Sequence, residues 1–141
     1  MVTPMTLKVL SIDDDSAMTE LLALLLKMHG YEPLSANTGE AGIKAIREKS
    51  PDVVILDLMM PGMDGWQVCA EVRKFSTVPI VIFSALDSPG LVASALDAGA
   101  DDYLVKPVPS GVLIAHLNKL TRRTEMNNGN KPKPQTAPIS A

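Results

Sequence analysis

Short apolar runs alternate along the chain with longer segments in which apolar residues recur at helical spacing. The run at residues 53–57 is apolar until its last position, which is typical of a parallel strand buried on both faces. Strands are predicted on this basis over residues 8–12, 32–36, 53–57, 79–84 and 102–106. They supply the framework on which the other features are placed.

A helix is predicted after each strand. The predicted ranges are 16–29, 38–49, 65–75, 88–98 and 110–122. The inward face of the first helix is expected to carry Met18, Leu21, Leu22, Leu25 and Met28. We expect Asn37 to cap the second helix, and Pro89 and Gly90 to interrupt the fourth. Strict strand–helix alternation predicts an α/β fold, a doubly wound (βα)5 domain with a five-stranded parallel sheet.

The alternation stops near residue 124, where polar and proline-rich sequence begins. We therefore expect one folded domain over residues 1–123 and a disordered tail or linker over residues 124–141. The 141-residue length suits a single domain with its own core.

Charge and composition exclude several classes of protein. The net charge is −3, with −6 over residues 1–120 and +3 after them, so direct nucleic-acid binding is not expected. No apolar run reaches the roughly 18 residues of a membrane span, and the start does not resemble a signal peptide. Cys69 is the single cysteine, which fits a reducing compartment, and we expect a cytoplasmic location.

Reactive side chains follow four of the five predicted strands. They are Asp13, Asp14 and Asp15 after the first strand, Asp57 on the third, Ser84 on the fourth and Lys106 on the fifth. Each alone suits an ordinary turn, cap or surface position. Because the carboxyl ends of parallel strands meet at one edge, where such sheets bind ligands, the set predicts a site.

The chemistry of this set points to phosphoryl transfer. Clustered carboxylates repel one another unless a cation neutralises them, and oxygen ligands suit Mg²⁺. A lysine opposite the metal can balance charge on a transferring phosphoryl group. An aspartate such as Asp57 can act as the nucleophile and form an acyl phosphate.

Four segments resemble the response-regulator receiver family of two-component and phosphorelay signalling, which includes chemotaxis-type receivers. Residues 57–65 resemble its phosphoacceptor loop, and residues 12–15 its acidic pocket. Residues 83–85 resemble its switch site, and residues 99–107 the block at its fifth strand. The likeness covers residues 6–122 in the family's order and spacing, so it is specific. It implies a receiver domain over residues 1–123 with strand order 2-1-3-4-5.

The resemblance also implies the roles of the acidic residues. Asp57 would accept a phosphoryl group from a histidine kinase or a phosphotransfer protein. Asp14, Asp57 and the backbone carbonyl of Met59 would bind Mg²⁺, with Asp13 acting mainly through bound water. The protein would then be a signalling switch rather than a turnover enzyme.

The remaining implied roles concern the switch. Lys106 would pair with the phosphate and form a cis peptide bond with Pro107, while Ser84 moves toward the phosphate and Tyr103 turns inward. The output partner is unknown, and its expected surface is the face formed by the fourth helix, fifth strand and fifth helix. A homodimer is one option, because the acidic residues of the fifth-strand block and the basic residues that end the last helix resemble those of receivers that dimerise through this face. These residues are Asp101, Asp102, Arg122 and Arg123.

Two features depart from the family's common pattern. Met59 and Leu86 stand at positions that affect how fast phosphate is lost, and neither can orient a water molecule, so slow self-dephosphorylation is expected. Residues 91–96 carry no charge, which indicates either an apolar partner surface or a mobile helix of weak propensity.

Other classes of protein stay as alternatives. An Asp-nucleophile phosphohydrolase usually has a second aspartate where Met59 stands, and a nucleotide-binding domain needs a glycine-rich loop after its first strand. A non-phosphorylated pseudo-receiver would lack signature residues that are present here. Cys69 is predicted to be a buried thiol and Trp66 to pack at the start of the third helix, while His29 and His116 look like neither phosphodonors nor ligands.

Overall fold

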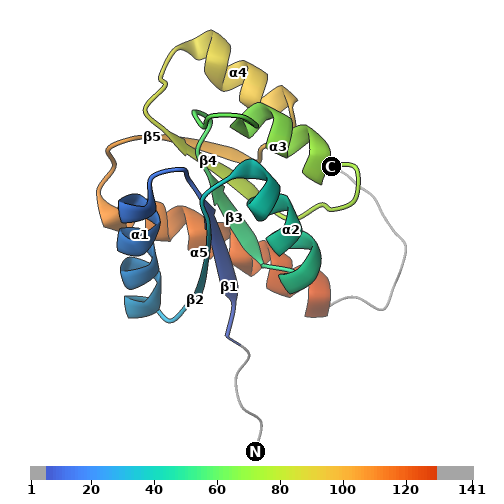
Figure 1. Cartoon of the computed structure of the whole chain (residues 1–141). Helices are drawn as coiled ribbons and strands as arrows, with labels where there is room; N and C mark the ends of the chain where they lie inside the picture. The colour runs from blue at the N-terminus through green and yellow to red at the C-terminus, as the bar shows by residue number, and fades with distance from the viewer. Residues whose placement is uncertain (1–5, 130–141) are drawn as a thin grey trace, which may run out of the picture.

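Strands and helices alternate along the chain as the apolar pattern predicts (Figure 1). The computed structural model describes the backbone of residues 6–129 and the side chains of residues 6–122. The strands are β1 (Lys8–Ile12), β2 (Glu32–Ala36), β3 (Val53–Leu56), β4 (Ile80–Ser84) and β5 (Asp102–Val105). The helices are α1 (Ser16–Met28), α2 (Gly39–Lys49), α3 (Gly65–Val72), α4 (Pro89–Asp97) and α5 (Ser110–Gly129).

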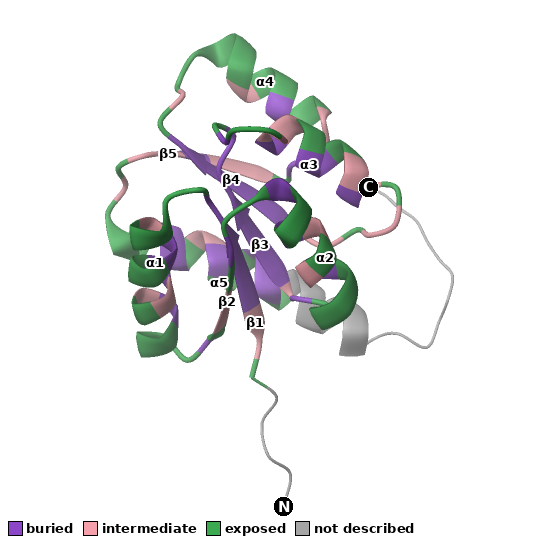
Figure 2. Ribbon diagram, viewed as in Figure 1, coloured by how far each residue is buried: buried purple, intermediate pink, exposed green. Residues whose placement is uncertain are grey.

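All five strands are parallel and lie in the order β2-β1-β3-β4-β5, which confirms the expected fold class and strand order. The strand β3 lies at the centre, and all four of its residues are buried. Figure 2 shows the buried strands enclosed between helices. The uninterrupted apolar run at residues 53–56 is therefore explained by cover on both faces.

Two hydrophobic clusters form the core, one on each face of the sheet. One cluster joins strand residues such as Leu10 and Ile82 to α2, α3 and the single buried residue of α4, Ala95. The other joins strand residues such as Val9 and Val81 to α1 and α5. The sheet is thus doubly wound, with its carboxyl edge open for a site.

The inward face of α1 differs from the expected one. Its buried residues are Thr19, Leu22 and Leu26, whereas Leu21 is 61% exposed and Met28 is 79% exposed. The prediction was therefore wrong for Leu21 and Met28. The burial of Thr19 sets this face, because its hydroxyl accepts a hydrogen bond from the Asn37 side chain at 3.1 Å.

Asn37 is not the cap of α2. Its side-chain amide also donates to the backbone carbonyl of Asp13 at 2.7 Å, which ties the end of β2 to the end of β1. The cap is Thr38, whose hydroxyl accepts from the Ala41 N–H at 3.0 Å. Thr38 therefore caps α2, while its neighbour Asn37 positions the acidic loop that follows β1.

Three further helix boundaries differ from the predicted ones. The helix α3 ends at Val72 rather than at residue 75. Pro89 begins α4 instead of interrupting it, since proline at the first helical position loses no hydrogen bond, and Ser88 is the cap. The backbone of α5 continues to Gly129, past the expected end at residue 122, so the predicted boundary at 123–124 falls inside this helix.

The predicted tail beyond Gly129 lies outside the described residues. Within residues 6–129, no helix is long and apolar enough to cross a membrane. The predicted strands agree with the observed ones to within one residue at each end.

Candidate functional site

The acidic residues meet at the carboxyl edge of the sheet. Asp13 directly follows β1 and Asp57 directly follows β3, and their backbone N–H groups extend the sheet's hydrogen bonds to Ala36 and Ile12. One carboxylate oxygen from each of Asp13, Asp14 and Asp57 lies within 4.8 Å of the others. Asp13 and Asp57 are buried, while Asp14 is exposed. The structure thus brings together the three carboxylates named from the sequence.

Lys106 supplies the positive charge opposite these carboxylates. Its Nζ lies 2.9 Å from a carboxylate oxygen of Asp13 and 3.7 Å from one of Asp57. The same nitrogen lies 5.3 Å from the centre of the Phe83 ring, which limits its access to water. The peptide bond between Lys106 and Pro107 is cis, as expected.

Burial dominates the electrostatics of Asp57. Desolvation raises the pKa of its carboxyl group, and the nearby Asp13 charge raises it further. The Lys106 ammonium and hydrogen bonds from Met59 and Ser84 lower the pKa, but the net shift is upward. The ionised carboxylate is therefore incompletely compensated by this chain's own groups, and a further cation would stabilise it.

The donor set fits Mg²⁺. All three candidate ligands are carboxylates, and Mg²⁺ binds through one or two carboxylates while keeping several waters. The exposed Asp14 leaves one side open for those waters. Met59 donates its backbone N–H to Asp57 Oδ1 at 3.3 Å, which fixes the orientation of the loop that follows the carboxylate.

Ser84 and Tyr103, the residues expected to form the switch, both hydrogen-bond to the backbone of Leu86. Ser84 is fully buried, and its Oγ accepts a hydrogen bond from the Leu86 N–H at 3.3 Å. The Tyr103 hydroxyl donates to the Leu86 carbonyl at 2.6 Å. Partial burial raises the pKa of Tyr103, with smaller upward contributions from Asp57 and Asp87 and a downward one from Ser84. Sequence reasoning missed Leu86 as this link, because a backbone contact leaves no mark on residue type.

The two acidic residues expected at a dimer face are paired inside the chain. Asp101 forms an ion pair with Arg73 at 2.9 Å and accepts a hydrogen bond from the Ile80 N–H. Asp102 contacts the imidazole of His116 on α5. Both carboxylates therefore have partners without a second copy.

Other sequence predictions concern residues away from the site. Cys69 is fully buried, and burial raises the pKa of its thiol to about 11, so it is a structural residue. His29 contacts the Leu25 carbonyl at the end of α1. Trp66 donates its Nε1–H to Ser94 Oγ at 2.9 Å, so it links α3 to α4 in addition to packing at the start of α3.

The fold and the site define a class of protein: doubly wound α/β domains with an acidic pocket and a facing lysine at the carboxyl edge. A family model described as the response regulator receiver domain matches residues 9–118. The chain belongs to this family.

Named relatives agree with this family. The chain is 41% identical over 116 residues to the transcriptional regulatory protein AfsQ1 of Streptomyces coelicolor, covering 82% of this chain and 52% of that protein. It is 39% identical over 118 residues to the DNA-binding response regulator MtrA of Mycolicibacterium smegmatis, covering 84% and 52%. The chain thus spans about half the length of the curated relatives it matches.

Solved structures give the same result. The Francisella response regulator 1452 receiver domain aligns with a TM-score of 0.80 at 34% identity, covering 84% of this chain and 99% of that one. The BeF3-activated N-terminal receiver domain of Klebsiella pneumoniae RstA aligns with a TM-score of 0.78 at 34% identity, covering 82% and 98%. Residues 9–118 therefore form a response-regulator receiver domain, whose family function is a signalling switch operated by phosphorylation of an aspartate.

Proposed function

We propose that Asp57 is the phosphoacceptor and that a histidine kinase or a phosphotransfer protein is the donor. The observation that carries this proposal is the convergence of Asp13, Asp14 and Lys106 on Asp57, a buried carboxylate at the end of the central strand. Asp13, Asp14, Asp57 and the Met59 carbonyl would hold Mg²⁺. When bound, the metal would neutralise charge on the transferring phosphoryl group.

The transfer needs little chemistry from the protein beyond positioning. A carboxylate oxygen of Asp57 attacks phosphorus, the bond from phosphorus to the donor's histidine nitrogen breaks, and that nitrogen keeps the bonding electron pair. Lys106, already 3.7 Å from Asp57, balances charge on the phosphoryl oxygens. The product is an acyl phosphate on Asp57 and a free imidazole on the donor.

The switch follows from the new charge. A phosphoryl group adds roughly −1.5 to −2 charge and three acceptor oxygens. The Ser84 hydroxyl, whose hydrogen bond lowers the pKa of Asp57, can donate instead to one of these oxygens, and Tyr103, which is bonded to the backbone of Leu86 as Ser84 is, responds with it. This exchange would shift a balance between two states of the α4–β5–α5 face, which would contact an output partner or a second copy.

The relatives are transcriptional regulators, so we propose that this domain controls such an output in the cytoplasm without contacting nucleic acid itself. A phosphohydrolase is the weaker alternative, because Met59 stands where its second aspartate is expected and cannot transfer a proton. A receiver that is never phosphorylated would not need the half-buried Lys106 beside two carboxylates.

Incubation with Mg²⁺ and acetyl phosphate tests the assignment. We expect a mass increase of one phosphoryl group on the intact protein, and peptide mapping should place it on Asp57. Chelation of Mg²⁺ with EDTA should abolish the increase, because the carboxylates would then repel the incoming phosphate. No adduct with acetyl phosphate or with phosphoramidate, at saturating Mg²⁺, would contradict the proposal.

The apolar side chains of Met59 and Leu86 should make the acyl phosphate on Asp57 long-lived. Met59 is 57% exposed and Leu86 is half-buried, and neither offers a group that orients an attacking water. A Met59→Asn, Leu86→Gln double variant is expected to lose phosphate several-fold faster, measured by the decay of the adduct after donor removal. A Val112→Asn variant, also exposed but on α5, is the matched control. An unchanged lifetime in the double variant would rule out this explanation.

A further inference from the structure

A shallow apolar pocket lies beside the candidate phosphoacceptor site. Its volume is about 500 Å³, within the range of ligand pockets in proteins. The lining residues come from the loop after β3, from α3, from the loop after β4 and from α4. They are Leu58, Met59, Met60, Pro61, Asp64, Trp66, Leu86 and Leu91. Among these described lining residues, Asp64 alone carries a charge.

The pocket spans two helices and contacts the switch. Trp66 on α3 forms one wall and is tied to α4 by its hydrogen bond to Ser94. The Leu86 side chain forms another wall, while its backbone holds both Ser84 and Tyr103. A group that enters the pocket therefore touches the residue through which the two switch side chains are connected.

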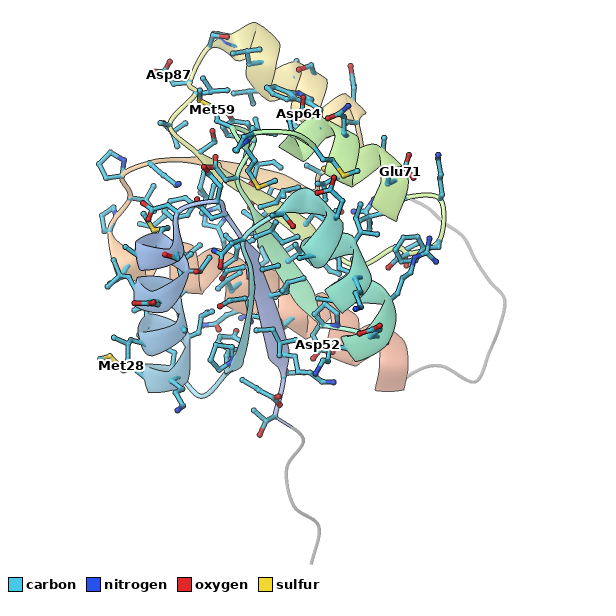
Figure 3. The ribbon with its side chains drawn as sticks, in the orientation of Figure 1. Met28, Asp52, Met59, Asp64, Glu71 and Asp87 are labelled. Carbon is cyan, nitrogen blue, oxygen red and sulfur yellow. The ribbon has the colours of Figure 1, made fainter. Side chains whose placement is uncertain are left out.

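The surroundings of the pocket are acidic. Asp64 lines the pocket, and Asp87 directly follows the lining residue Leu86 in the sequence. The basic residues after α3 are paired elsewhere, Arg73 with Asp101 and Lys74 with Glu71. Figure 3 labels the exposed Met59 between Asp87 and Asp64. The apolar pocket thus has carboxylates at its rim and a basic charge nowhere in its lining.

We propose that this pocket receives one large apolar side chain of a protein partner, presented by a segment in which Lys or Arg residues flank it. The apolar lining favours a side chain that loses contact with water, since burial of such surface is stabilising. The acidic rim favours flanking cations and excludes acidic segments. This surface lies between α3 and α4, and only Leu91 belongs also to the α4–β5–α5 face.

Occupancy of the pocket and the state of the switch are coupled through Leu86. The coupling rests on the proposed phosphorylation of Asp57, whereas binding of the segment to the pocket does not. A partner that prefers one position of Leu86 binds one state more tightly, and phosphorylation then changes its affinity by the same factor by which the partner changes phosphorylation.

Selection from a displayed peptide library tests the binding. The unphosphorylated chain is used as bait, and the parallel bait is a Leu91→Glu variant. Glutamate is tolerated in the first turn of α4 but puts a charge into the pocket. Leu24→Glu, on the solvent face of α1 where Leu24 is 63% exposed, is the matched control. Thermal melting confirms that each variant is folded.

We expect wild type and Leu24→Glu to enrich peptides with one Phe, Leu, Ile, Met or Trp between Lys or Arg residues. Binding of a synthetic enriched peptide, followed by fluorescence anisotropy, should weaken at least tenfold in Leu91→Glu and several-fold in Asp87→Lys. Enrichment of nothing, of acidic peptides, or of the same peptides by Leu91→Glu would overturn the proposal.

The coupling is tested with the same peptide and acetyl phosphate. We expect the peptide's affinity to change several-fold on phosphorylation. Equal affinities in a sample shown by mass spectrometry to be phosphorylated would overturn the coupling but leave the binding intact. A sample that takes up no phosphate instead contradicts the proposed function, so the two failures are distinguished.

Discussion

An Asp57→Asn variant is expected to take up no phosphoryl group from acetyl phosphate and to unfold at a higher temperature than wild type in metal-free buffer at neutral pH. Uptake is lost because an amide is not a competent nucleophile toward phosphorus. The gain in stability follows from the raised pKa of Asp57, since burial penalises the ionised carboxylate more than Lys106 compensates it. The amide keeps the shape of the side chain without the charge.

The raised pKa of Asp57 also fixes the direction in which the difference in melting temperature changes with pH. A carboxyl group whose pKa is raised on folding binds its proton more tightly in the folded state than in the unfolded state. Its contribution to stability is therefore lost as pH rises from the ordinary value of 3.8 through the raised folded pKa. The difference in melting temperature between Asp57→Asn and wild type should grow across that window and then stay constant up to neutral pH.

The exposed Asp87 provides the matched control. Asp87→Asn makes the same substitution at an exposed carboxylate and should keep phosphoryl uptake. A phosphoryl adduct on Asp57→Asn at the wild-type rate would refute the assignment of the acceptor. A lower melting temperature than wild type at neutral pH without metal would refute the account of its electrostatics.

A Gly65→Ala variant is expected to lose both stability and phosphoryl uptake. A Cβ at Gly65 would lie 2.6 Å from the backbone oxygen of Asp57 and 2.7 Å from the Cα of Leu58. Because these are backbone atoms, α3 and the loop that follows β3 must move apart, and overpacking of this kind costs about 1–3 kcal/mol or more. A 1 Å misplacement of a reacting group can slow its reaction about 10²-fold.

Urea unfolding and the acetyl phosphate assay measure the two effects separately. Gly90→Ala is the matched control, because a Cβ there meets nothing within 4 Å in the first turn of α4. Alanine in place of glycine inside a helix should raise the free energy of unfolding by about 0.5–1 kcal/mol. Equal stability of Gly65→Ala and wild type would contradict the close contact of α3 with the loop that follows β3.

The sheet and the acidic site were predictable because their signals are strong and local. Parallel strands covered on both faces have no polar positions to blur their limits, as at residues 53–56, and their last residues fall at one edge. Asp13, Asp57 and Lys106 therefore met where the sequence placed them.

The face of α1 was not predictable from its pattern. The helix contains five leucines between residues 21 and 26, so it offers little contrast between a buried and an exposed stripe. The choice of Leu22 and Leu26 over Leu21 depends on Thr19, which bonds to Asn37 after the next strand. Such a long-range contact has no counterpart in local periodicity.

The cap of α2 and the hydrogen bonds to the Leu86 backbone could not be predicted for a related reason. Asn37 and Thr38 are both competent caps, and only the competing hydrogen bond of Asn37 to the Asp13 carbonyl assigns the role to Thr38. The connection of Ser84 and Tyr103 through Leu86 uses its backbone N–H and carbonyl, which every residue but proline possesses. Residue identity carries no information about such contacts.

The small buried area of α4 determines how much free energy is needed to displace this helix from the sheet. All of α4 lies within the described residues, and Ala95 is the one fully buried side chain in it, so little apolar area holds this helix to the sheet, beside the hydrogen bond from Trp66 to Ser94. A segment with so little buried apolar area opens at a free energy well below that of global unfolding. We therefore expect α4 to be displaced many times for each global unfolding event. A change of state at this helix then does not require the hydrophobic core to unfold.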